Sequence, residues 1–174
     1  MAILSTRRPP LCAMVLVLLS LAWPIQAQQE RLEYQVKAAF LFNFLKFVEW
    51  PAAPNESPWV IGILGRDPFG EILDDIVRGK IVKNRTVEVR RFARSADVKD
   101  CNILFVGRLD FENMGTPVHP GLLTVGEAPG FLKSGGVINF YLESNRVHFE
   151  IRSDVARLYG LHVSAQLLKL GRAL

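Results

Sequence analysis

The sequence lacks the local motifs that mark common catalytic and nucleotide-binding sites. It contains no G-x-S-x-G nucleophile turn, no phosphate-binding P-loop and no G-x-G-x-x-G dinucleotide fingerprint. Its three histidines, His119, His148 and His162, are far apart and do not have the spacing of metal ligands. We therefore predict that the protein is not an enzyme, with no catalytic residues, no metal site and no cofactor.

The sequence has no apolar run long enough to span a membrane. Its N-terminal run, Leu11–Trp23, has 13 apolar or small residues, whereas a spanning helix needs roughly 20. Arg7 and Arg8 precede this run, and the small residue Ala27 follows it. A basic start, a short apolar stretch and a small residue are typical, in this order, of a secretory signal peptide. We predict cleavage after Ala27, with an uncleaved N-terminal anchor as the alternative.

This cleavage site determines the predicted domain and its charge. Residues 1–27 form the signal peptide, and residues 28–174 form one domain. Removing residues 1–27 takes away two arginines and no acidic residue, so the net charge falls from +4 to +2 and gives no support for a nucleic-acid partner. It also removes Cys12, and Cys101 alone cannot form an internal disulfide. We expect Cys101 to pack as a small hydrophobe, with an intermolecular disulfide as the alternative.

The most distinctive stretch of the sequence is KAAFLFNFLKFVEWP, residues 37–51, which holds four phenylalanines within eight residues. The pattern predicts a helix from Glu30 to Glu49 that is apolar over most of its circumference, and such a helix must be covered on more than one side. One side is expected to face the core, and the other a second subunit or a partner protein. The candidate partner or dimer surface comprises Phe40, Phe44, Phe47 and Trp50.

The rest of the sequence alternates between apolar strands and short helices. Buried strands are predicted at 59–65, 101–107 and 121–127, a strand near a sheet edge at 85–92, and a hairpin around Ser144-Asn145. Ser153 is predicted to cap the helix that follows the hairpin. The order predicts a single α/β domain with a mostly parallel or mixed sheet of about five to six strands, flanked by helices, with a late antiparallel hairpin.

Glycine-rich turns follow several of the predicted strands. Because ligands of open α/β sheets bind beyond the carboxyl ends of the strands, residues at these turns are candidates for a ligand site. The candidate ligand rim comprises Arg66, Asp67, Glu127 and Phe131. The alternative is that these residues only close and cap the turns.

Several segments, taken in order, resemble the YfiR-like family of exported bacterial proteins. The segments are YQVKAAFLFNFLKFVEWP, IGILGRDPFG, CNILFVG, LLTVGEAPGFLKSGGVINFYLESNRVHFEI and VARLYGLHVSAQLLKLGRAL. Together they extend over essentially all of residues 33–172. The resemblance implies a compact periplasmic α/β protein that tends to form a homodimer, with no catalytic activity and no stable membrane insertion after signal cleavage.

The same resemblance implies a regulatory role. The best-known role in the family is to contact the periplasmic part of an inner-membrane diguanylate cyclase and repress it, which lowers cyclic di-GMP and disfavours biofilm. The best-known members carry disulfides, whereas this chain keeps only Cys101 after cleavage, so sensing through an internal disulfide is not expected here. The alternative function is a periplasmic small-molecule binding module that reports to a membrane sensor.

Overall fold

The computed structural model describes residues 11–51, 57–114 and 119–174, with side chains from residue 28 onward except those of 112–114. Arg7 and Arg8, at the start of the predicted signal peptide, lie outside these residues. The chain divides into two compact units, residues 1–33 and 34–174. The described part of the first unit is helical, and the strands found among the described residues belong to the second unit.

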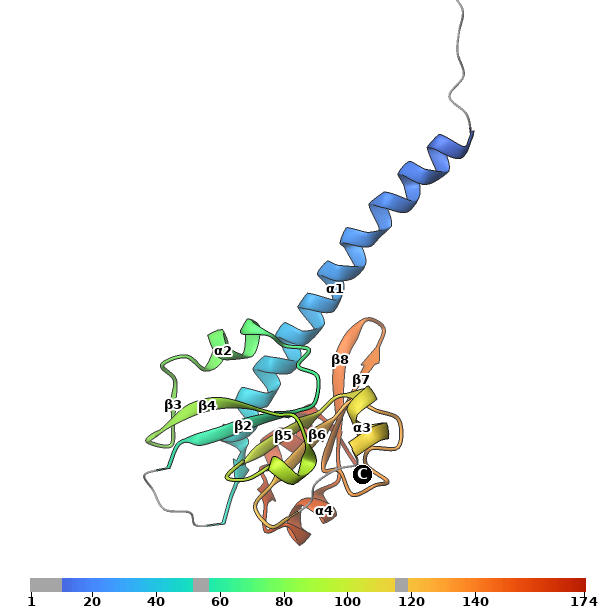
Figure 1. Ribbon diagram of the computed structural model, residues 1–174. Coiled ribbons are helices and arrows are strands. Elements are labelled where there is room, and N and C mark those ends of the chain that lie inside the picture. The colour runs from blue at the N-terminus through green and yellow to red at the C-terminus, as the bar shows by residue number, and fades with distance from the viewer. Residues whose placement is uncertain (1–10, 52–56, 115–118) are drawn as a thin grey trace, which may run out of the picture. The chain divides into compact units, whose positions relative to one another are not determined.

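The larger unit is built around an eight-stranded sheet with the order β10-β8-β7-β6-β5-β2-β4-β3 (Figure 1). These strands are β2 (Trp59–Leu64), β3 (Ile81–Val82), β4 (Arg85–Phe92), β5 (Ile103–Val106), β6 (Leu123–Gly126), β7 (Ile138–Glu143), β8 (Arg146–Ile151) and β10 (Arg172–Ala173). The neighbours from β4 through β2, β5 and β6 to β7 run parallel, as do β8 and β10. The β7–β8 and β3–β4 pairs are antiparallel, so the sheet is mixed.

A second, two-stranded sheet joins segments that are distant in the sequence. It pairs β1 (Val48–Glu49) with β9 (His162–Val163) in antiparallel register. The predicted number of about five to six strands is therefore too low for this α/β fold. Most of the additional strands, β1, β3, β9 and β10, have only two residues each, which is too short to produce a period-two pattern in the sequence.

The helix predicted from Glu30 to Glu49 begins earlier, at Leu11, and ends at Phe47, because Val48 and Glu49 pair with β9 as a strand. The helices are α1 (Leu11–Phe47), α2 (Glu71–Val77), α3 (Arg108–Met114), α4 (Ser153–Leu158), α5 (Ala165–Leu170) and the 3-10 turn η1 (Ser95–Asp97). The predicted cap of α4 is wrong, because Ser153 lies inside that helix and no side chain caps its start. A serine does cap α5, where Ser164 Oγ accepts a hydrogen bond from the backbone N–H of Leu167.

Apolar side chains fill both faces of the central strands. One core lies between the sheet and the helices α1, α2, α4 and α5, and α1 contributes Ala38, Leu41, Phe44 and Leu45 to it. The other core is on the opposite face and contains Leu64, Leu104, Val106 and Phe131, with Phe111 of α3 packed against it. Because both faces are covered, β2, β5 and β6 are buried throughout, which is why their sequences are continuously apolar.

Cys101 belongs to the second core. Cys101 is buried, and its thiol donates a hydrogen bond to the carbonyl of Ile103 at 2.9 Å. Burial raises the pKa of the Cys101 thiol to about 12, because a thiolate is poorly solvated among apolar groups. These features agree with the expected role as a small hydrophobe and argue against a disulfide with a second chain.

We predict that Cys101 in the folded protein does not react with a thiol reagent such as dithionitrobenzoate at pH 8. At that pH the raised pKa leaves almost no thiolate, and the sulfur is shielded from solvent. In denaturant the same residue should react within minutes. The Cys101→Ser variant, whose hydroxyl can donate to the same carbonyl, is the blank for the assay. Rapid labelling of the folded protein would contradict the buried position.

Candidate functional site

The carboxyl ends of the parallel strands β2, β5 and β6 lie next to one another at one edge of the sheet. The register pairs Leu64 with Val106, and Val106 with Gly126. The residues that follow these strands, Gly65, Gly107 and Glu127, therefore start neighbouring loops. In open α/β sheets this edge is the usual place for a ligand.

A buried ion pair connects α1 with the end of β6. Lys37 Nζ lies 2.6 Å from Glu127 Oε2, and only 4% and 13% of their side chains are exposed. Tyr34 donates a hydrogen bond from its hydroxyl to Glu127 Oε1 at 3.2 Å. The Lys37 ammonium also lies 4.6 Å from the centre of the Tyr34 ring, within the range of a cation–π contact. Glu127, a predicted rim residue, is thus held by charge-assisted contacts inside the protein.

A second carboxylate, that of Asp110 in α3, lies at the same edge. Its Oδ2 accepts a hydrogen bond from the backbone N–H of Arg66 at 3.1 Å. A Cβ atom at Gly65 would be 2.1 Å from Asp110 Oδ1, and the φ of Gly65 is +78°, so only glycine fits there. A Cβ at Gly107 would lie 3.3 Å from Asp110 Oδ2 and 4.0 Å from Glu127 Oε1. The carboxylates of Asp110 in α3 and Glu127 after β6 therefore both lie close to Gly107.

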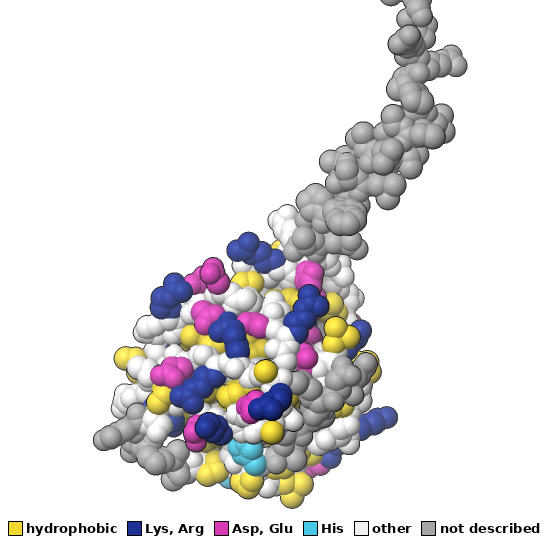
Figure 2. Space-filling model, viewed as in Figure 1, with side chains coloured by type: hydrophobic (Ala, Val, Ile, Leu, Met, Phe, Trp, Pro, Cys, Tyr) yellow, Lys and Arg dark blue, Asp and Glu magenta, His cyan; other side chains and the backbone are white. Residues whose placement is uncertain are grey.

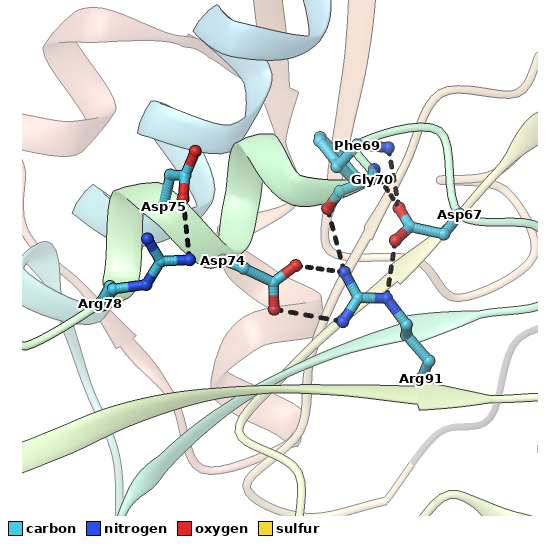
Figure 3. A network of polar contacts seen from close by, with 7 residues as sticks. All are labelled: Asp67, Phe69, Gly70, Asp74, Asp75, Arg78 and Arg91. Carbon is cyan, nitrogen blue, oxygen red and sulfur yellow. Dashed lines mark hydrogen bonds and ion pairs between the residues drawn. The ribbon is translucent and has the colours of Figure 1, made fainter.

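Asp67 takes part in a network that connects the loop after β2 with β4 and α2 (Figure 3). Asp67 Oδ1 accepts hydrogen bonds from the backbone N–H groups of Phe69 and Gly70, at 2.7 and 3.2 Å. Its Oδ2 accepts a bond from Arg91 Nε at 2.7 Å. The two terminal nitrogens of the same Arg91 donate to both carboxylate oxygens of Asp74 at 3.2 and 2.5 Å. Arg91 thus forms a bidentate pair with one aspartate and a single bond with the other.

This network changes the protonation equilibria of its members. The hydrogen bond from Arg91 is the main cause that lowers the pKa of Asp74, and the same bond raises the pKa of Arg91. A carboxylate with a lowered pKa contributes stability above its unfolded pKa, and loses it as the pH falls through the lower folded value. The contribution is therefore complete at neutral pH and is lost only in acid.

The other two predicted rim residues have different positions. Arg66 is exposed, whereas Phe131 is fully buried and lies in the core instead of on the rim. The cause is the pair of glycines beneath its ring: a Cβ atom at Gly126 or Gly136 would lie within 2.5 Å of the Phe131 side chain. Phe111 makes an edge contact with the ring from α3. Arg66, Asp67 and Glu127 follow strand ends, as the sequence indicates, whereas Phe131 turns inward. A ligand at this rim stays a prediction.

The predicted partner or dimer surface also divides into buried and partly exposed residues. Phe44 is fully buried, since its ring packs against Phe140 and Phe149 of the sheet at centroid distances of 6.0 and 5.5 Å. It therefore lies in the core and not on a surface. Phe40, Phe47 and Trp50 are partly exposed, and Trp50 lies 5.1 Å from the ring of Trp59. Contact of these three residues with another protein stays a prediction.

The described surface is mixed in charge. Figure 2 shows basic and acidic side chains side by side over one face, with hydrophobic side chains in small patches between them. Among the residues with described positions, no group of three or more His, Cys, Asp or Glu side chains could hold a metal ion. Within the same residues, none of the helices is both long and apolar enough to cross a membrane.

We predict that Lys37→Met lowers the free energy of unfolding by about 2–4 kcal/mol, because it leaves the Glu127 carboxylate largely buried and without its cation. Urea denaturation measures the change. The double variant Lys37→Met/Glu127→Leu should be more stable than Lys37→Met, since it removes the uncompensated charge. Lys46→Met on the exposed side of the same helix is the matched control and should change stability by less than about 0.5 kcal/mol. Equal effects at positions 37 and 46 would contradict the role of the ion pair.

For Asp67 we predict that the alanine variant loses about 1–2 kcal/mol of stability, because two backbone N–H groups and Arg91 lose their acceptor. Asp67→Asn should lose less, since its side-chain oxygen still accepts from Phe69 N. The control is Asp75→Ala, which removes only an exposed pair with Arg78 (Figure 3) and should lie within about 0.5 kcal/mol of wild type. Chemical denaturation separates the three variants, and an unaffected Asp67→Ala would show that the network does not hold the loop.

Comparison with known proteins identifies one family. A family model described as YfiR/HmsC-like matches residues 34–172. None of the curated proteins compared with the chain matches it. The match confirms the resemblance inferred from the motifs, and the matched residues include the complete candidate site, from Tyr34 to Glu127.

Proposed function

Because the chain belongs to the YfiR/HmsC-like family, we propose that it is a periplasmic regulator that represses an inner-membrane diguanylate cyclase by direct contact with the periplasmic part of that enzyme. Repression lowers cyclic di-GMP and, through it, biofilm formation. The family match over residues 34–172 is the observation that carries this proposal. The family is regulatory and not catalytic, so the protein acts by binding and not by chemistry.

The arrangement of the candidate site supports a binding role. Glu127 is paired with Lys37, and Asp67 with Arg91, so these carboxylates stabilise the positions of loops and of α1. A general acid or base needs a carboxyl group that can reach a substrate and exchange a proton with it. Glu127 and Asp67 instead form contacts that stabilise the loops at this edge of the sheet, which supports a protein that acts through its surface.

Export is part of the proposal. Residues 1–27 are the signal peptide in this scheme, and residues 28–174 are the domain that reaches the periplasm. Only the exported domain has access to the periplasmic part of an inner-membrane partner. The proposed function therefore requires the domain to be exported, whereas a role inside the cell would not.

The test is the cellular level of cyclic di-GMP after deletion of the gene. We expect a rise on deletion, because the cyclase loses its repressor. The intact chain should reverse the rise, and so should residues 28–174 behind an unrelated signal peptide. Residues 28–174 without a signal peptide form the matched control and should not reverse it.

Two results would contradict the proposal. An unchanged cyclic di-GMP level on deletion would remove the cyclase from the scheme and favour the alternative, a small-molecule binding module that reports to a membrane sensor. Full reversal by the unexported domain would place the action inside the cell. If cyclic di-GMP does not change on deletion, capture of the membrane partner by the exported domain would identify what the protein contacts.

A further inference from the structure

One edge of the eight-stranded sheet is largely without a neighbouring strand. On its inner side β4 pairs with β2 from Val87 to Phe92. On its outer side it pairs with β3, and only at Arg85 and Thr86. Among the described residues, the later part of β4 therefore has no strand beside it on the outer side. We call residues Glu88–Phe92 the β4 edge. Unpaired backbone groups at such an edge are a template for another strand.

The backbone of β4 directs alternate residues toward β2 and toward the outer side. The carbonyl of Phe92 accepts a hydrogen bond from the N–H of Gly65 at 2.8 Å, so Phe92 directs its carbonyl toward the β2 side. Along an extended strand, neighbouring residues direct these groups to opposite sides. Val89 and Arg91 therefore present both their N–H and their C=O groups to the outer side. No loop or turn of the described residues hydrogen-bonds to these four groups.

The β4 edge lacks several features that commonly keep another strand away, namely prolines, lysines and bulges. It contains no proline and no lysine, and β4 pairs with β2 without interruption from Val87 to Phe92. Its two exposed charges, Glu88 and Arg90, have opposite signs and do not repel a strand of mixed charge. An extended segment is the structure whose own alternating backbone groups match those of this edge.

We infer that the β4 edge binds an extended segment of the membrane partner as an additional, antiparallel strand of the sheet. The inference rests on the proposed function, because it states how the repressor holds the periplasmic part of its partner. Five residues of the segment face the β4 edge. Those opposite Val89 and Arg91 form the hydrogen-bonded pairs, and the other three form the closer, non-hydrogen-bonded pairs. In this mode of binding the main chain supplies affinity and the side chains supply specificity.

The side chains of the edge determine the chemistry of the segment. Glu88 and Arg90 lie on one face of β4, with side chains 49% and 40% exposed, and form an ion pair of 3.2 Å. Phe92 follows them on the same face and packs against the second core. Opposite charges in directly facing positions are favourable, and like charges are destabilising. The segment therefore carries a basic residue opposite Glu88, an acidic residue opposite Arg90 and an apolar residue opposite Phe92.

The contacts of Arg91 keep the other face of the edge fixed and compensated in charge. Its guanidinium points toward α2 and is held by Asp67 and Asp74 (Figure 3). Because this charge already has its partners, the segment needs no acidic residue opposite Arg91. The same contacts fix the end of β4, so less conformational freedom is lost when the segment binds.

The same edge of a second copy of the chain is a poorer occupant. An antiparallel pair of two β4 edges centred on Val89 places Phe92 of one copy opposite Thr86 of the other. That place is already taken, because Ile81 pairs with Thr86. With the centre at Arg90, two arginines face each other, which is destabilising. A five-residue segment that ends opposite Glu88 meets neither obstacle.

The first test uses a synthetic peptide, acetyl-Val-Thr-Glu-Val-Lys-amide, whose residues face Phe92 to Glu88 in this order. Amide hydrogen exchange of the exported domain, residues 28–174, is followed by NMR as peptide is added. Exchange at Val89 and Arg91 should slow by about tenfold at a peptide concentration ten times the Kd. The amides of Glu88 and Arg90 point toward β2 and are the internal control, so their exchange should change little.

A second peptide with the glutamate and the lysine exchanged is the matched control for charge. It should bind about tenfold more weakly, because both of its charges face like charges. The double variant Glu88→Arg/Arg90→Glu should reverse the preference between the two peptides. Reversal by exchanged charges distinguishes a direct contact from damage to the fold.

The second test measures repression by the natural partner in cells that lack the gene. Val89→Pro removes an outward N–H at a position where edge strands accept proline. It should leave cyclic di-GMP at the level of the deletion strain, although the variant is exported and is folded by circular dichroism. Arg94→Glu reverses a charge just beyond the edge, on a side chain that is 76% exposed. It is the matched control and should restore the low level.

Four results would overturn the inference. Two are an unchanged amide exchange at Val89 and Arg91 up to millimolar peptide, and equal binding of the two peptides. Full repression by folded Val89→Pro is the third, and it would leave the proposed repressor function standing. The fourth is a wild-type dimer in sedimentation equilibrium that Glu88→Arg dissociates, since a second copy would then occupy the edge. If deletion of the gene does not raise cyclic di-GMP, the proposed function fails, whereas the peptide experiment still decides whether the β4 edge accepts a strand.

Discussion

The packing of α1 against one face of the parallel strands is the contact on which the rest of the structure depends. Phe44 packs against the rings of Phe140 and Phe149, and Leu41 and Leu45 belong to the same core. The Lys37–Glu127 pair orients the same helix at the strand ends, where an unpaired charge in a poorly solvated position would be costly. Apolar burial holds the helix on the sheet, and the ion pair specifies where along the sheet it lies.

The sequence predicted the elements whose patterns are long. The buried strands β2, β5 and β6 and the hairpin at Ser144-Asn145 occur where they were expected. The Phe-rich helix also forms, with bounds of Leu11–Phe47 in place of the predicted 30–49. The turn residues Ser144 and Asn145 have positive φ values of 50° and 61°, as a two-residue hairpin connection requires. The edge position of β4 was also expected from its mixed pattern. By contrast, β1 and β9 depend on a contact between segments that are distant in the sequence, which no local pattern predicts. The strands β3 and β10 have only two residues each, too few for a periodic pattern.

The sequence predicted that the candidate residues lie at strand ends, but it did not predict the side chains that they contact. Strand-end turns located Asp67 and Glu127, but their partners Arg91 and Lys37 lie 24 and 90 residues away in the chain, beyond any local motif. Asp110 was missed because α3 itself was not predicted. Its signal was indirect: the glycines after β2 and β5 leave room for a side chain from elsewhere. For Phe131, burial depends on the space over Gly126 and Gly136, which only the folded backbone reveals.

The small β1–β9 sheet has a consequence for how the chain comes to be folded. Val48 pairs with Val163, so the end of the first long helix is held by a segment close to the C-terminus. A chain made from its N-terminus presents α1 long before this closing strand exists. Its apolar face must remain uncovered until nearly the whole polypeptide has emerged, and such surface is prone to aggregate. The pairing of β1 with β9 can therefore form only after the C-terminal segment has been made.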